Sequence, residues 1–90
     1  MRFAVICRDK PDSLHIRQET RPEHLAYLKG TGVVEQAGTF LDEDGKMIGS
    51  LVILTLGTRK AAENWAANDP YAKAELFQSV TIQAWNKVIG

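Results

Sequence analysis

The stretch VVEQAGTFLDEDGKMIGSLVILTL, residues 33–56, contains two strand-like segments separated by an acidic turn. Residues 33–42 and 47–56 are rich in apolar and β-branched side chains, which favours strands, and the intervening EDGK favours a tight reversal. We expect the turn to be centred on Asp44 and Gly45, because an Asp-Gly pair accepts the positive φ angles of hairpin turns. The stretch therefore predicts an antiparallel β-hairpin in the middle of the chain.

The segments around this hairpin supply one strand and one helix on each side. RFAVIC, residues 2–7, is a short apolar strand pattern closed by a turn. TRPEHLAYLKGTG, residues 20–32, has Thr20 and Glu23 at capping-box spacing and glycines at its end, which predicts a helix. After the hairpin come TRKAAENWAAND, a helix pattern behind a Thr58 cap, and QSVTIQAWNKV, residues 78–88, whose alternation predicts a half-exposed strand.

The resulting order, β-α-β-β-α-β, is that of the ferredoxin-like split motif. It predicts an α+β fold with a four-stranded antiparallel sheet and both helices on one face. In this topology the first and third strands are central, and these are the continuously apolar ones, FAVIC and LVIL. The helices cover only one face of such strands. We therefore expect a homodimer through the open sheet face, as in a dimeric α/β barrel.

Composition narrows the function classes. The chain has 90 residues, which we expect to form one domain over residues 1–90, and 11 basic residues balance 11 acidic ones. Without a basic block, nucleic acid and anionic membrane are disfavoured as partners. No apolar run approaches the ~20 residues of a membrane span, and residues 3–7 are too short for a signal peptide, so a cytoplasmic location is expected.

Metal and redox chemistry find little support in the sequence. The only cysteine, Cys7, excludes an internal disulfide and is expected to be a small buried hydrophobe. His15 and the acidic turn residues 42–44 lack the number of ligands that a metal loop needs. We expect no metal and no organic cofactor, and we expect Trp65 and Trp85 to be core or interface aromatics.

Two titratable residues, His24 and Asp69, are candidates for an acid/base pair. The simpler interpretation makes His24 a packing residue and Asp69 a cap for the helical turn begun by Pro70. If the first helix starts at Thr20, the two side chains lie about 15 Å apart along the helix axis at ~1.5 Å per residue. If it starts near Asp12 and bends at Pro22, their heights match. Both starts are compatible with the sequence.

A His24–Asp69 hydrogen bond would have a chemical use. The carboxylate would fix the imidazole tautomer and make the second ring nitrogen a better proton acceptor near neutral pH. Asp69 could cap its helical turn with one oxygen and face the histidine with the other. The remaining candidates are an anion clamp of Arg17 and Arg21, four residues apart, and the pocket residues Ser50 and Tyr71. For the two arginines, solvated surface side chains are the simpler interpretation. For Ser50, the simpler interpretation is an ordinary small residue at the start of a strand.

Three stretches together resemble the YciI-like (YCII-related) family over nearly the whole chain: RQETRPEHLAYL, AGTFLDEDGKMIGSLVIL and ENWAANDPYAKAELFQSVTIQAW. The resemblance implies a ferredoxin-like dimer related to dimeric α/β barrels, with His24 and Asp69 as an active pair in a pocket. One related member is a dehydrochlorinase acting on a chlorinated hydroxyquinol. The chain departs from the family pattern at Thr39, where a proline commonly follows the hairpin glycine.

These observations favour a cofactor-free acid/base enzyme of lyase, isomerase or dehydrochlorinase type that acts on a small molecule. The alternative is a non-catalytic module that binds a small ligand or serves as an accessory dimerisation domain. A cofactor-free monooxygenase, a third interpretation, rests on analogy between folds alone.

Overall fold

The structure, a computed structural model, describes all residues 1–90 and contains one sheet and three helices. The sheet has the order β2-β3-β1-β4 and every pairing is antiparallel. The first and third strands are thus central, and the predicted ferredoxin-like α+β fold is confirmed. The elements are β1 (Arg2–Asp9), α1 (Leu14–Gly30), β2 (Val34–Leu41), β3 (Met47–Thr55), α2 (Arg59–Ala67), α3 (Pro70–Lys73) and β4 (Phe77–Trp85).

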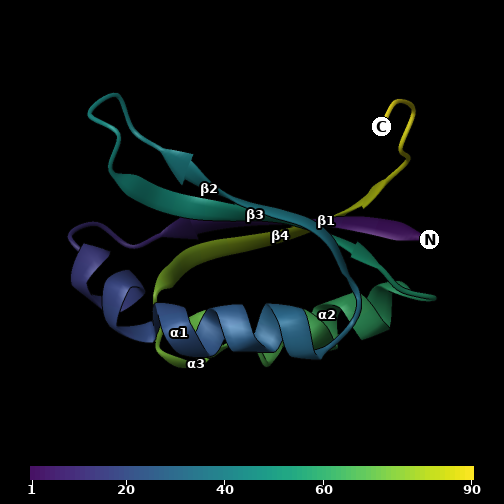
Figure 1. Cartoon of the computed structure of the whole chain (residues 1–90), viewed down its shortest axis with the longest axis horizontal. Coiled ribbons are helices and arrows are strands. Elements are labelled where there is room, and N and C mark those ends of the chain that lie inside the picture. Colours follow the sequence, from purple (N-terminus) through teal and green to yellow (C-terminus); the bar gives the residue numbers. More distant parts are fainter.

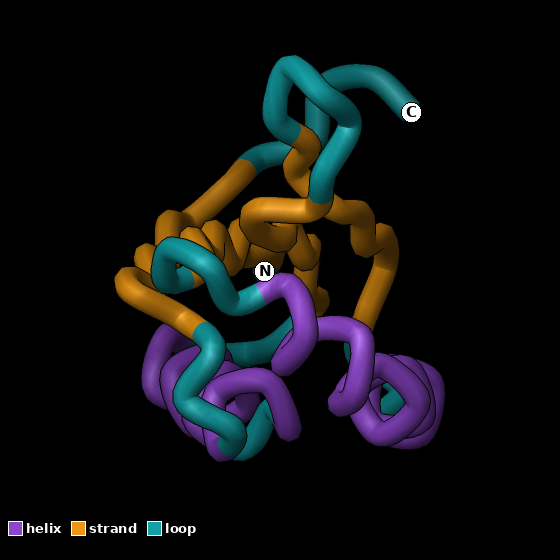
Figure 2. Tube along the Cα trace, turned by 90° about the vertical axis from the view of Figure 1, so that its left-hand side faces the viewer, coloured by secondary structure: helices purple, strands orange, loops and turns teal.

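The core lies between the sheet and its helices, which cover the same face (Figures 1 and 2). β1 and β3 contribute every second side chain to this core, among them Phe3, Val5 and Cys7. Burial, with a smaller contribution from the charge of Asp69, raises the pKa of Cys7 to about 12, so the residue stays a thiol. Cys7 is buried, as expected.

No helix of the chain is long and apolar enough to cross a membrane.

The first helix decides where the site forms. α1 begins at Leu14, close to the earlier of the two predicted starts, and Thr20 lies inside it. The capping box predicted at Thr20 is therefore wrong; the helix runs through Pro22, because the segment before it contains helix-forming residues and no glycine. His24 comes 10 residues after Leu14, and Asp69 comes 10 residues after the first residue of α2. The two residues consequently stand at the same height.

The chain reversals differ from the sequence expectation in one detail. The β2–β3 turn is centred on Glu43 and Asp44, one residue earlier than predicted, because Gly45 N–H bonds to the carbonyl of Asp42. Gly45 follows in the left-handed region, with φ of 80°, which a glycine adopts without strain. The predicted Thr58 cap is confirmed, since its hydroxyl accepts the N–H of Ala61 at 3.1 Å.

Candidate active site

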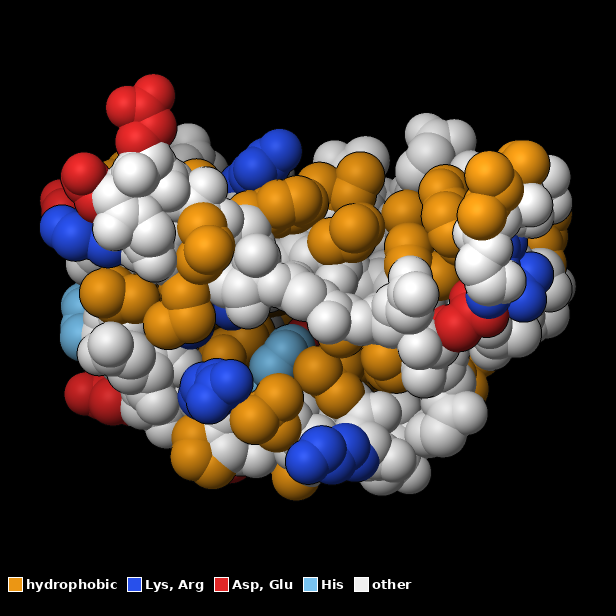
Figure 3. Space-filling model, turned by 45° about the horizontal axis from the view of Figure 1, so that its top comes forward, with side chains coloured by type: hydrophobic (Ala, Val, Ile, Leu, Met, Phe, Trp, Pro, Cys, Tyr) orange, Lys and Arg blue, Asp and Glu red, His pale blue; other side chains and the backbone are white.

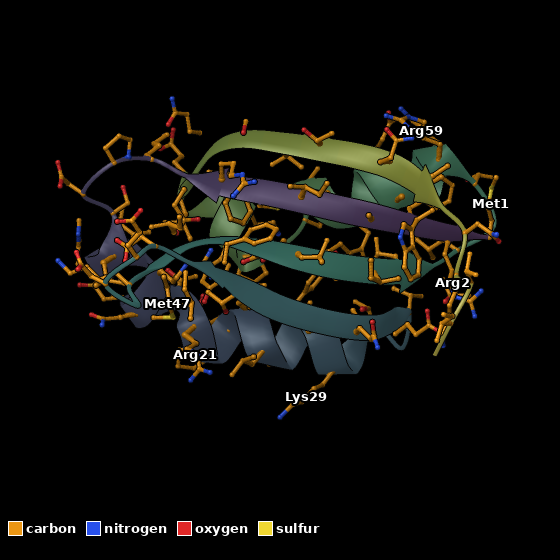
Figure 4. The ribbon with its side chains drawn as sticks, turned by 90° about the horizontal axis from the view of Figure 1, so that it is seen from above. Met1, Arg2, Arg21, Lys29, Met47 and Arg59 are labelled. Atoms are coloured by element: carbon orange, nitrogen blue, oxygen red, sulfur yellow. The ribbon has the colours of Figure 1, made fainter.

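A cavity of about 150 Å³ lies between α1 and the β2–β3 edge of the sheet. It is lined by five of the predicted site residues: Arg17, Arg21, His24, Ser50 and Tyr71. Figure 3 shows this face hollowed, with a histidine side chain on the floor of the hollow. Figure 4 shows Arg21 and Met47, from α1 and the start of β3, near one another at the mouth. Segments distant in the sequence thus converge on one partly open cavity.

His24 and Asp69 form the pair that the early helix start makes possible. His24 Nδ1 lies 2.8 Å from Asp69 Oδ1, and the two residues are 6% and 3% exposed. A carboxylate only accepts, so Nδ1 carries the proton and the other nitrogen, Nε2, keeps its lone pair. Nε2 has no protein partner, and no fully buried side-chain nitrogen or oxygen is left without one. Nε2 is therefore accessible from the cavity that His24 lines.

Asp69 combines this contact with a structural role. It is the N-cap of α3 and accepts the backbone N–H of Tyr71 at 2.9 Å, while Pro70 occupies the first helical position. The expectation that Asp69 divides the two tasks between its oxygens is wrong, because both donors reach Oδ1. An oxygen with two lone pairs accepts both, so capping and holding the imidazole are compatible.

Tyr71 lies directly against the histidine. Its ring stacks on the imidazole with centroids 3.8 Å apart and planes 16° apart, and the residue is 1% exposed. Burial raises the pKa of Tyr71, while the charges of Arg17 and Arg21 act in the opposite direction. The residue therefore stays a neutral phenol that occupies the wall beside His24.

Arg17 is held inside the protein by Asp9, a residue that has no functional signal in the sequence. Its Nε and Nη2 donate to the two Asp9 oxygens at 2.7 and 2.8 Å, and Nη2 also donates to Ser50 Oγ at 2.9 Å. Burial acts to lower the pKa of Arg17, but the hydrogen bonds and charge of Asp9, together with a smaller contribution from Tyr71, raise that pKa overall. The fork of Arg17 is thus already engaged by a carboxylate.

Arg21, the other half of the predicted clamp, has a different environment. It is exposed and forms no ion pair, so its charge at the mouth is uncompensated.

Thr39, the position that departs from the family pattern, lies opposite Ser50 in the β2–β3 register and also lines the cavity. Leucine and valine side chains complete an apolar wall: Leu25, Leu28 and Val52.

The other singled-out residues lie elsewhere. Trp65 belongs to the core, as expected, and its indole N–H donates to Thr31 Oγ1 at 3.0 Å; Trp85 is 39% exposed. His15 is exposed on α1, outside the cavity. No three His, Cys, Asp or Glu side chains are close enough together to hold a metal ion.

Comparisons with known proteins agree with this architecture. The model of the YCII-related domain matches residues 1–86. The protein YciI of Escherichia coli O6:H1 is 33% identical over 98% of this chain and 99% of its own length. The solved structure of 5-chloro-2-hydroxyhydroquinone dehydrochlorinase from Burkholderia phenoliruptrix, in complex with 2,5-dihydroxybenzoquinone, superposes with a TM-score of 0.87 at 29% identity, covering 96% of this chain and 94% of that one.

A more distant structure shares the fold. An antibiotic biosynthesis monooxygenase superposes with a TM-score of 0.60 at 14% identity, over 98% of both chains. At this identity the likeness concerns the arrangement of helices and strands alone.

Proposed function

Since this chain belongs to the YCII-related family, we propose that it is a cofactor-free acid/base enzyme acting on a small ring-shaped molecule. His24 is the general acid/base and Asp69 orients it. One observation carries the proposal: the Nδ1–H of the His24 imidazole is held by a buried carboxylate, and its Nε2 is accessible from a partly open cavity. A base in this arrangement takes a proton from a bound molecule without a metal or a covalent intermediate.

The dimensions and lining of the cavity support a substrate of about one ring. A volume of about 150 Å³ is comparable to that of an engineered protein cavity that binds benzene. The apolar wall suits the ring faces, and Arg21 offers an uncompensated positive charge at the mouth to an anionic oxygen of the bound molecule. Hydroxylated, halogenated aromatics combine these features, and the similar dehydrochlorinase acts on such a molecule by its name.

The proposed step is an elimination. Nε2 of His24 accepts a proton from a ring hydroxyl, and the electrons of that O–H bond form a carbon–oxygen double bond. The displaced ring electron pair takes the proton back from the imidazolium at the chlorine-bearing carbon, which becomes saturated. Nε2 then accepts the proton of a second ring hydroxyl conjugated with that carbon, a second carbon–oxygen double bond forms, the ring double bond between them shifts, and chloride leaves with the electron pair of the carbon–chlorine bond. The net loss is HCl, and the product is a quinone. Asp69 stabilises the imidazolium that forms, because its carboxylate already accepts the Nδ1 proton.

Turnover of chlorinated hydroxyquinols tests this function. We expect the purified protein, without added metal or cofactor, to release one chloride for each quinone formed, measured by ion chromatography and absorbance. Arg21→Gln should raise KM by about 10-fold and change kcat little, because the arginine contributes charge at the mouth. Binding without chloride release, measured by calorimetry, would instead favour the ligand-binding module; oxygen consumption would favour a monooxygenase.

We further propose that a second copy of the chain covers the open sheet face. Strand alternation places Ile6 and Leu51, which lie opposite each other in the β1–β3 register, on the face away from the helices, and both side chains stay partly exposed there. Light scattering should give twice the chain mass for the wild type. Leu51→Lys should give the single mass, whereas Leu41→Lys, on the exposed end of β2, should stay dimeric. A wild type at the single mass would contradict the dimer.

A further inference from the structure

The hydrogen bond to Asp69 does not by itself fix the plane of the His24 ring. It joins Nδ1 to Oδ1 at 2.8 Å, and this one contact tolerates some turning of the ring about its Cβ–Cγ bond, because a hydrogen bond accepts a range of angles. The direction of the Nε2 lone pair depends on this rotation. A general base needs the lone pair aimed at the proton it removes, so a second contact must set the plane.

The contact that sets the plane is the ring of Tyr71. We propose that Tyr71 is a positioning residue: its buried ring, stacked on the imidazole at 3.8 Å and 16°, holds His24 so that Nε2 points into the cavity. The inference rests on the proposed acid/base role of His24 and adds the residue that acts through it. The electron-rich face of a phenol ring also suits the imidazolium that His24 becomes on accepting a proton.

Tyr71 is itself fixed on several sides. Its backbone N–H donates to the same Asp69 oxygen that holds His24, and Pro70 restricts the backbone before it. The edge of its ring meets Phe77, with centroids 6.0 Å apart and planes at 83°, and the Arg17 guanidinium carbon lies 4.7 Å from its centroid. The single helical turn after Asp69 therefore presents both the hydrogen-bond acceptor and the aromatic platform for one imidazole.

Direct substrate binding by Tyr71 fits these contacts less well. The residue lines the cavity but is 1% exposed, and one face of its ring is covered by the imidazole. Little ring surface remains for a ligand to stack on. The two roles make different predictions, because loss of a substrate contact raises KM, whereas loss of a positioning contact lowers kcat.

The test compares Tyr71→Phe, which keeps the ring, with Tyr71→Leu, which removes it; both keep the backbone N–H that Asp69 accepts. Nitrogen-15 NMR of the His24 ring reports its tautomer and the exchange of the Nδ1 proton with water. We expect the wild type and Tyr71→Phe to show only the Nδ1–H tautomer, with a slowly exchanging proton. In Tyr71→Leu the ring loses its platform and turns away from Asp69 in part of the molecules, which breaks the Nδ1–H hydrogen bond. Both tautomers should then be populated, and exchange should be at least about 10-fold faster.

Turnover and a matched control complete the experiment. In Tyr71→Leu, kcat should fall by about 10- to 100-fold with KM nearly unchanged, as a misplaced base predicts. Phe40→Leu removes an aromatic ring that lies against Arg8, outside the cavity lining, and should leave the tautomer unchanged. Should Tyr71→Leu fail to fold, Tyr71→Met, with a longer flexible side chain, is measured in the same way.

The NMR measurement separates the two proposals. The Tyr71→Leu protein could show both tautomers while the wild type shows no turnover. That result would support the positioning role of Tyr71 and contradict the proposed function. An unchanged tautomer and exchange rate in a folded Tyr71→Leu protein would overturn the positioning role. A rise in KM at constant kcat would also overturn it, in favour of direct substrate contact.

Discussion

Replacing His24 with glutamine is expected to lower kcat by about 10²- to 10⁴-fold, because general acid/base catalysis contributes a factor of this size. Glutamine is polar enough to stay hydrogen-bonded beside Asp69 but cannot accept and return a proton. Initial rates of chloride release, with circular dichroism to verify the fold, measure the effect. The matched control is His15→Gln on the same helix, since His15 is exposed and lies outside the cavity. Equal rates in the wild type and His24→Gln would exclude the proposed function.

Asp69→Asn separates the charge of the carboxylate from its hydrogen bonds. Both donors, the Nδ1–H of His24 and the N–H of Tyr71, converge on Oδ1, so the single carbonyl oxygen of an asparagine can accept both. The tautomer and the cap of α3 should therefore survive the substitution, while the negative charge opposite the imidazolium is lost. The loss of kcat should lie between those of His15→Gln and His24→Gln.

The fold was predictable because the signals that define it are local. FAVIC and LVIL are apolar on both faces, which identifies the central strands, and the turn and cap residues mark where elements end. The start of α1 was ambiguous for a physical reason. Thr20 and Glu23 have the spacing of a capping box, but a capping box has no effect inside a helix whose preceding residues are also helical.

The site was predictable only in part. His24 and Asp69 emerged from helix geometry and a family resemblance, but Asp9 gave no signal, because an acidic residue at a strand end is usually solvated. Only the fold brings it to Arg17, eight residues further along the chain. Similarly, the stacking of Tyr71 on His24 depends on how α3 packs against α1, and sequence spacing contains no information on that contact.

The Arg17–Asp9 pair should be the most costly polar interaction to break. The side chains of Arg17 and Asp9 are 2% and 6% exposed and joined by two hydrogen bonds, so Arg17→Met leaves a buried carboxylate without its partner. We expect the free energy of unfolding to fall by about 3–5 kcal/mol, a large fraction of the roughly 5–15 kcal/mol that typical domains possess. Urea denaturation followed by tryptophan fluorescence measures it.

A double-mutant cycle distinguishes an unpaired charge from lost packing. Arg17→Met with Asp9→Leu removes both charges, so it should cost clearly less than the sum of the two single substitutions. Glu63→Gln, which breaks the exposed Arg59–Glu63 pair, should change stability by less than about 0.5 kcal/mol. If Arg17→Met costs no more than Glu63→Gln, the buried pair does not stabilise the fold. If the prediction holds, the guanidinium against Ser50 and Tyr71 is fixed by Asp9, and the wall of the cavity depends on a residue outside it.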